Sequence, residues 1–275
     1  MITIGFVIDT IETPSAGTEK QLLMLLERLD PQRFRPVLVC LRDSPWMRTQ
    51  KFDFPVEVLG LDSLVSLSLL AAFRKFHDLH RSYRFDVVQT FFVDANLFGT
   101  VAARLSNVRW VVSSRRNMGY WHTAIKVWAL RALVPLTDVY LGNSQSVGRT
   151  LCQVEWVRRK PVRVIYNGID TDRIGERDPG LRNAQRDAWG VRKEEWLIGV
   201  IANLRPVKKI CLIVEMMEQL SLERDDVKAV VVGEGEQREV LERAINVSAL
   251  DGKIKLVGAV DDIRPCLAAF DIGVL

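Results

Sequence analysis

Cysteine and histidine are scarce in this sequence, and the few that occur are scattered. The 275 residues include four cysteines, none in a C-x-x-C pair, and three histidines that lie far from all of them. Zinc sites need clustered Cys and His ligands, so we expect no metal site of this kind. We expect four free, buried thiols: Cys40, Cys152, Cys211 and Cys266.

Long apolar runs are also missing. No run approaches the ~20 residues that a membrane-spanning helix needs. The first residues, MITIGFVID, have neither the basic start nor the long apolar core of a signal peptide. We therefore expect a cytoplasmic protein. Hydrophobic residues make up 48% and charged residues 26%, which is typical of a globular chain and not of a disordered one.

Positive charge is concentrated in one part of the chain. Residues 1–170 hold 22 Lys and Arg against 15 Asp and Glu, whereas residues 171–275 hold 16 against 19. Within 104–163 there are 11 basic residues and two acids, Asp138 and Glu155. Such a basic field attracts the phosphates of nucleotides, lipid diphosphates, anionic membranes or nucleic acid. No nucleic-acid recognition motif accompanies it, so we expect no nucleic-acid partner.

Short apolar runs alternate with segments of helical periodicity, and this alternation predicts an α/β protein with parallel sheets. The helices expected between the runs include Leu67–Tyr83, Ala95–Leu105 and Ile210–Gln219. The predicted strands are Ile2–Asp9, Pro36–Leu41, Val56–Leu59, Asp86–Thr90, Trp110–Ser114, Val139–Asn143, Val162–Tyr166, Trp196–Ala202, Lys228–Val232, Lys255–Val257 and Asp271–Leu275.

Residues 168–195 have almost no apolar periodicity, and we interpret them as a linker region. The pattern predicts two Rossmann-like domains, 1–167 and 196–275, that face a cleft. Ligands of such sheets bind at the carboxyl ends of the strands. The loops that follow the strands are therefore the candidates for chemistry.

Two of these loops lie in the second run of elements, and the first of them favours a diphosphate. The segment Asn203–Lys209 joins a buried strand to a helix and holds three cations, including Arg205 and Lys208. Fixed cations beside a helix N-terminus suit a leaving diphosphate. The G-x-G of Gly233–Gly235 has Arg238 where a dinucleotide fold has its third glycine, which disfavours NAD.

Two further loops carry weaker signals. Gly17 lies in a small turn before a helix, where a backbone can approach a phosphate, although a plain turn explains it as well. Asp170 and Asp172 look like a carboxylate pair for a metal. They lie where the linker begins and have no third acidic ligand nearby, so we reject a metal there.

Taken together, these loops resemble motifs of the retaining glycosyltransferases of family 4, which have the GT-B fold. Each motif alone is unspecific, and their order on the expected elements carries the resemblance. The matching stretches are Asp94–Leu105 for H-A-N-L-x-G-x-x-A-A-R-L, Asn143-Ser144 for N-S, Tyr166–Asp170 for Y-N-G-I-D, Asn203–Lys208 for R-L-x-P-x-K and Gly233–Arg238 for G-x-G-P-x-R.

The resemblance implies an N-terminal acceptor domain, a C-terminal nucleotide-sugar domain and transfer with retained anomeric configuration, without a cofactor beyond a UDP- or GDP-linked sugar. Fixed cations would replace a metal. A role in cell-surface polysaccharide synthesis follows from the same resemblance. The implied catalytic residues are Arg205, Lys208 and Asp94, and the implied donor-binding residues are Gly17, Asn203, Gly233, Glu234 and Gly235.

The chain departs from the family at two points. Asp94 stands where the family often has a histidine, and we expect it to cap the following helix and contact a sugar. The family's paired glutamates would follow the strand that begins at Asp271, beyond Leu275. We therefore expect the second domain to be incomplete and this 275-residue chain to be inactive.

The acceptor side is expected after the strand Trp110–Ser114, where Arg115, Arg116 and Asn117 would contact a glycan, lipid-linked or small-molecule acceptor. Trp121 and Trp128 lie among cations in the next segment. That pattern fits peripheral contact with an anionic membrane at the inner face of the plasma membrane, but a seven-residue spacing fits a core-facing stripe too.

Two other functions remain open at this point. A sugar-nucleotide epimerase shares the two-domain cleft, although its histidine-rich and acidic signatures are not visible. A non-catalytic nucleotide-sugar or glycan-binding protein is the alternative outside enzymology, since the family histidine is absent.

Overall fold

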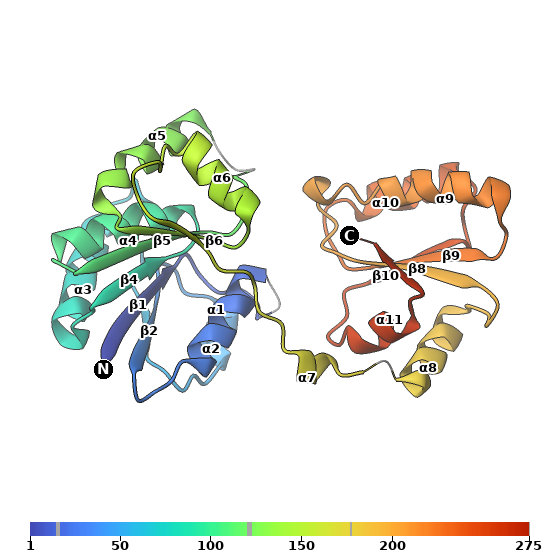
Figure 1. Ribbon diagram of the computed structural model, residues 1–275, viewed down its shortest axis with the longest axis horizontal. Helices are drawn as coiled ribbons and strands as arrows, with labels where there is room; N and C mark the ends of the chain where they lie inside the picture. The colour runs from blue at the N-terminus through green and yellow to red at the C-terminus, as the bar shows by residue number, and fades with distance from the viewer. Residues whose placement is uncertain (15–16, 120–122, 177, 275) are drawn as a thin grey trace. The chain divides into compact units, whose positions relative to one another are not determined.

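The computed structural model describes residues 1–14, 17–119, 123–176 and 178–274, and it divides into two units, Met1–Ile169 and Asp170–Leu275. Figure 1 shows that each unit has a sheet with helices on both of its faces. Each unit is therefore a doubly wound α/β layer structure in its own right, as the alternation of strands and helices predicted.

In the described residues of the first unit, seven parallel strands form one sheet in the order β3-β2-β1-β4-β5-β6-β7. The predicted strands of this half are confirmed, because runs such as Phe6–Ile8 and Val37–Cys40 are buried on both faces of the sheet. The strands are β1 (Ile2–Ile8), β2 (Phe34–Cys40), β3 (Val56–Val58), β4 (Val87–Thr90), β5 (Trp110–Arg115), β6 (Val139–Gly142) and β7 (Val162–Val164).

The two larger hydrophobic clusters of this unit lie one on each side of the central strands. Leu22 and Leu26 of α1 pack with Phe6 of β1, whereas Phe76 of α3 and Phe98 of α4 pack with the opposite face. The helices are α1 (Gly17–Arg28), α2 (Pro45–Thr49), α3 (Ser68–Tyr83), α4 (Val93–Leu105), α5 (Ala124–Ala132) and α6 (Gln145–Val154), with a 3-10 turn at Val134–Leu136.

The second unit, over the part that the structure describes, has four parallel strands in the order β10-β9-β8-β11. The strands are β8 (Trp196–Ile201), β9 (Val227–Val232), β10 (Ile254–Gly258) and β11 (Ile272–Val274). The helices are α7 (Thr171–Ile174), α8 (Pro179–Trp189), α9 (Leu212–Glu223), α10 (Arg238–Val247) and α11 (Arg264–Ala269). Met217 of α9 and Leu241 of α10 pack on one face of the sheet, and Phe270 packs on the other.

The predicted linker, residues 168–195, is not irregular throughout, because residues 179–189 form helix α8 of the second unit. Asp178 caps this helix, Pro179 fills its first position and Gly190 ends it in the left-handed conformation. Arg182 and Arg186 bind the carboxylate of Asp271 at 2.6 and 2.9 Å. The segment lacks apolar periodicity because arginines, not only apolar side chains, fasten α8 to its unit.

The thiols are free, as expected, but they are not all fully buried. Cys40 and Cys266 are buried, whereas Cys152 and Cys211 are half-buried. Burial raises the pKa of the Cys40 thiol to about 12, so this thiol is unreactive at neutral pH.

In both sheets the order of the strands reverses beside the first strand of the unit. The reversal lies between β1 and β4 in the first unit and between β8 and β11 in the second. In doubly wound sheets, ligands bind at the carboxyl ends of the strands near such a reversal. The functional residues are therefore sought at these two edges, one in each unit.

Candidate functional site

Exposed cations follow the carboxyl end of β8. Arg205 and Lys208 are exposed, and neither side chain has a hydrogen bond or ion pair with any residue that the structure describes. Between them lies a 3-10 turn that begins at Pro206, in which the Lys208 N–H donates to the Arg205 carbonyl at 2.9 Å. Lys209 ends this turn in the left-handed conformation. The turn thus fixes the backbone of both cations while their charged ends stay free.

The Gly233–Gly235 loop lies directly against this cation loop. Ile201 and Val232 are paired in the sheet, so the two loops leave neighbouring strands at the same level. The Leu204 N–H donates to the Glu234 carbonyl at 2.9 Å. A Cβ on Gly233 would lie 2.0 Å from the Ala202 carbonyl oxygen, and the φ of Gly233 is +141°. Glycine is therefore required here for backbone packing, whatever ligand the loop meets.

The carboxylate of Glu234 is exposed and forms an ion pair with Arg238. Arg238 also binds Glu242 at 2.9 Å, so this arginine is held by two glutamates. Asn203 is exposed beside Arg205. The structure thus gathers the predicted donor residues of the second unit at one edge: Asn203, Arg205, Lys208, Gly233, Glu234 and Gly235.

Asp94, at the carboxyl edge of the first unit, does not cap helix α4, and this prediction is wrong. The cap is Asp9 at the end of β1, whose Oδ1 accepts the Ala95 N–H at 2.7 Å. Asp94 lies in the first helical turn and binds Arg42 at 3.2 Å, and Arg42 also faces Asp9 at 3.7 Å. Phe92, just before α4, has a φ of +64°, a strained value for an aromatic residue.

Asp9 has an unusual protonation equilibrium for an aspartate. Burial raises its pKa to about 7, and the nearby charges of Asp94 and Glu19 add to the increase, against the opposing effects of the Ala95 N–H and Arg42. Sequence reasoning missed Asp9 and Arg42. The one available signal was a charged residue directly after a buried strand, beside the point where the strand order reverses.

Arg115 is buried, so the prediction that it contacts an acceptor is wrong. Its Nε and Nη2 donate to the two oxygens of Glu155 at 2.8 and 2.7 Å, and its Nη1 donates to the Ser113 hydroxyl at 2.8 Å. The side chains of Arg115 and Glu155 are 6% and 2% exposed. This ion pair ties β5 to the end of α6 and has no surface for a ligand.

The next residue, Arg116, stays available. Its Nε is buried without a hydrogen-bond partner in the described residues, and so is the Oδ1 of Asn143. Arg115 and Gly142 are paired in the sheet, which places Arg116 and Asn143 side by side, and the Asn143 Nδ2 donates to the Arg116 carbonyl at 3.0 Å. Burial lowers the pKa of Arg116. Asn117 accepts the Gly119 N–H at 2.8 Å.

Gly17 begins helix α1 and has open space around the position of a Cβ. One turn later, Gln21 makes two hydrogen bonds to the backbone of Gly168, each 2.8 Å long. These bonds fasten the Tyr166–Asp170 segment to α1. Sequence reasoning missed Gln21, since a lone glutamine carries no signal. Trp121, named with the acceptor side, and Ser15, Ala16 and Leu275 lie outside the described residues.

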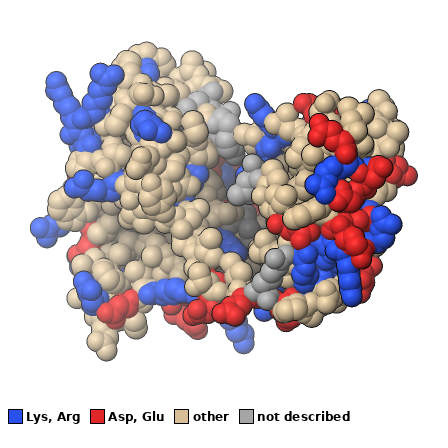
Figure 2. All heavy atoms as spheres, turned by 45° about the vertical axis from the view of Figure 1, so that its right-hand side comes forward, with Lys and Arg blue, Asp and Glu red and all other residues tan. Residues whose placement is uncertain are grey.

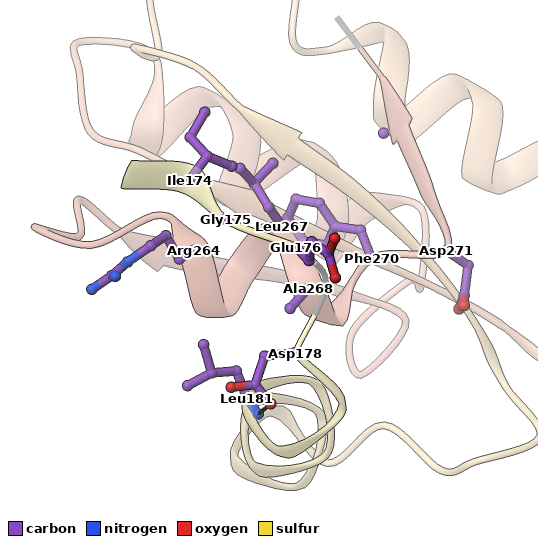
Figure 3. A pocket seen from close by; sticks show the side chains of 11 residues that line it. Ile174, Gly175, Glu176, Asp178, Leu181, Arg264, Leu267, Ala268, Phe270 and Asp271 are labelled. Carbon is purple, nitrogen blue, oxygen red and sulfur yellow. Dashed lines mark hydrogen bonds between the residues drawn. The ribbon is translucent and has the colours of Figure 1, made fainter. Parts of the chain in front are cut away.

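A cavity of about 390 Å³ opens in the second unit between the segment after α7, the start of α8 and α11 (Figure 3). Asp271, which precedes β11, lines it, so the cavity lies at the amino edge of the sheet, away from the cation loop at the carboxyl edge. In Figure 3, Arg264 extends away from the other labelled side chains. The cavity is therefore separate from the candidate donor site.

The described part of the chain has no group of three His, Cys, Asp or Glu side chains arranged to hold a metal ion. Nor does any helix in that part combine the length and the apolar character needed to cross a bilayer.

Comparison with known proteins identifies relatives of both units. The model of Glycosyltransferase Family 4 matches residues 15–173, and that of Glycosyl transferases group 1 matches residues 195–275. The chain is 23% identical over 281 residues to the Escherichia coli "UDP-Gal:alpha-D-GlcNAc-diphosphoundecaprenol alpha-1,3-galactosyltransferase", a match that covers 94% of this chain and 70% of that protein.

Solved structures show the same fold. Anabaena Alr3699/HepE in complex with UDP matches with a TM-score of 0.82 and 22% identity, over 99% of this chain and 73% of that one. A glycosyltransferase from Rickettsia africae matches with a TM-score of 0.78 and 16% identity, over 99% and 72%. Since one family model covers more than half of the residues, the chain belongs to Glycosyltransferase Family 4, and its fold is that of the GT-B glycosyltransferases.

Proposed function

We propose that this protein transfers a sugar, with retention of anomeric configuration, from a UDP-linked donor to a glycan, lipid-linked or small-molecule acceptor in polysaccharide synthesis. The observation that carries the proposal is the pair of unpartnered cations, Arg205 and Lys208, after β8. Other arginines of this unit, such as Arg182, Arg224 and Arg264, are bound to carboxylates. Cations held on a fixed backbone without an internal partner suit a diphosphate that gains charge as it leaves.

The relatives favour a uridine nucleotide over a guanosine one. The Escherichia coli relative is named for UDP-Gal and a diphosphoundecaprenol-linked acceptor, and Alr3699/HepE has been solved with UDP and with UDP-glucose. In the proposed site, Arg205 and Lys208 bind the diphosphate and the Gly233–Gly235 loop lies beside the nucleoside. Asp94, held by Arg42, and Arg116 are the proposed sugar and acceptor contacts of the first unit.

The test is binding of UDP to the 275-residue chain by calorimetry. A charge-assisted contact contributes about 1.5–3 kcal/mol, so Lys208→Ala should weaken binding at least about tenfold. Lys193→Ala is the matched control, because Lys193 is also exposed but precedes β8 at the opposite edge of the sheet. Equal UDP affinity in the wild type and Lys208→Ala would refute the assignment of the diphosphate site.

A further inference from the structure

Helix α5 in the first unit exposes an apolar face. Leu130 is its buried residue, and the side of the helix opposite Leu130 carries Ala124, Ile125, Trp128 and Ala132, with Arg131 at its edge. Ile125 is 83% exposed and Trp128 is 60% exposed. A surface helix normally has charged and polar residues on its outer face. This outer face therefore points to an interaction that the described residues do not supply.

A second tryptophan, from the loop after α6, extends this face. Trp156 is 52% exposed. Its ring packs edge to face against that of Trp128, with 5.5 Å between the ring centroids. Arg131 lies over both rings, 4.9 and 3.6 Å from their centroids, and its Nε donates to the Val154 carbonyl at 2.9 Å. We call Ile125, Trp128 and Trp156 the aromatic patch. Its indoles are held in place on the surface by Arg131.

The backbone at Trp156 has a conformation that disfavours a tryptophan. Its φ is +62°, in the left-handed region at the end of α6. Glycine is the usual residue at such helix ends, and a bulky aromatic residue is disfavoured there. The chain therefore keeps an exposed indole at a position where glycine would be less strained.

The segment that carries the aromatic patch, residues 104–163, is strongly basic. Of the two acids in residues 104–163, Asp138 is bound by Arg104 at 2.6 Å and Glu155 by the buried Arg115. Exposed cations remain on α5, α6 and the following loop: Lys126, Arg149, Arg158 and Arg159. In Figure 2, the uppermost part of the first unit shows Lys and Arg without acidic side chains, whereas acidic and basic side chains are mixed over the second unit.

We propose that the aromatic patch and its surrounding cations form a docking surface for an anionic lipid bilayer. Indole rings bury their apolar body at the membrane interface, while Lys and Arg meet lipid phosphates just outside it. The phosphate backbone of a nucleic acid would give an exposed isoleucine and two indoles no apolar contact. This surface involves none of the proposed donor residues, so the inference goes beyond the proposed transfer reaction.

The experiment is flotation of the full chain with vesicles of phosphatidylcholine and phosphatidylglycerol, against vesicles of phosphatidylcholine alone. The wild type should float with the anionic vesicles and lose this binding as salt rises. Arg158→Glu with Arg159→Glu should weaken binding at least about tenfold, because each basic residue near the surface contributes and reversal doubles the change. Trp128→Ser and Trp156→Gly should each weaken it several-fold.

The tryptophan variants separate docking from folding. Trp156→Gly relieves backbone strain, so it should leave the melting temperature unchanged or raise it while binding falls. Trp110→Ser is the matched control, since Trp110 is 47% exposed at the amino end of β5 and should not affect flotation. UDP affinity should be equal in all variants, which keeps this test independent of the donor site.

Three results would overturn the proposal. The first is a wild type that stays unbound to anionic vesicles at low salt. The second is flotation that Trp128→Ser, Trp156→Gly and the double arginine variant leave unchanged. The third is a concentration-dependent dimer, seen by light scattering, that disappears in Trp128→Ser, since the patch would then be covered by a second copy of the chain.

Discussion

The Asp9 carboxylate accepts the N–H of Ala95 at 2.7 Å and so caps helix α4 from the end of strand β1. The two residues are 86 positions apart. Their contact joins the end of β1 to the start of α4, the helix that follows β4, next to the point where the strand order of the first sheet reverses. Burial in this junction is the main cause of the raised pKa of Asp9, so the same geometry that positions α4 makes the fold sensitive to pH.

The first prediction is that Asp9→Asn changes how stability depends on pH. The pKa of Asp9 is about 7 in the folded chain, against about 3.9 for a free aspartate, so the folded state holds the extra proton between these values. The unfolding free energy of the wild type should therefore fall by up to about 1.4 kcal/mol for each pH unit as pH rises through this window. Above about pH 7, Asp9 should cause no further decrease.

The amide introduced by Asp9→Asn would keep an oxygen that accepts the Ala95 N–H and would not titrate. Urea unfolding of both proteins between about pH 5 and 8 measures the difference. The unfolding free energy of Asp9→Asn minus that of the wild type should increase with pH up to about pH 7. Parallel curves for the two proteins would show that Asp9 titrates normally.

The second prediction concerns the buried pair of Arg115 and Glu155. Removing one partner leaves an uncompensated buried charge, which costs about 3–5 kcal/mol. Glu155→Ala should therefore destabilise the first unit strongly in thermal unfolding, and the double variant Arg115→Met with Glu155→Leu should recover much of the loss. A cost below about 1 kcal/mol for Glu155→Ala would show that Arg115 has another partner or reaches solvent.

The third prediction is that Gly233→Ala disrupts the contact between the two loops of the second unit. An added Cβ would clash with the Ala202 carbonyl oxygen, and the backbone conformation disfavours any side chain. We expect a loss of about 2–4 kcal/mol in unfolding free energy and weaker UDP binding.

Gly252→Ala is the matched control for this variant. Gly252 also has a positive φ, +82°, but open space around the Cβ position. It should lose about 1–2 kcal/mol and keep its UDP affinity. If both substitutions lowered stability and affinity equally, close packing at Gly233 would not be the cause.

The fourth prediction is that UDP binding does not depend on a divalent metal. In the proposed site, Arg205 and Lys208 neutralise the diphosphate directly. Calorimetric titration with UDP should give the same affinity in EDTA as in Mg²⁺, and affinity should fall with salt because the contacts are ionic. A strict requirement for Mg²⁺ would contradict direct neutralisation of the diphosphate by Arg205 and Lys208.

Much of the fold could be predicted from the sequence because the signals are local. A buried parallel strand is a short apolar run, so strands such as Ile2–Ile8 and Val227–Val232 were found close to their observed ends. The cation loop was found for the same reason, since Arg205 and Lys208 lie within four residues on one strand-to-helix connection. Helix α8 was missed because arginine contacts to Asp271, and not an apolar stripe, secure much of it.

The sequence by itself determined the alternation of elements, the two parallel sheets and the family motifs, since each depends on residues that are neighbours along the chain. Only the tertiary structure decided that Asp9 and not Asp94 caps α4, that Arg115 is buried on Glu155, and that Trp128 meets Trp156 around Arg131. Each of these contacts joins residues from different elements. Strand order and register bring such residues together, and neither is encoded in the local pattern of apolar and polar residues.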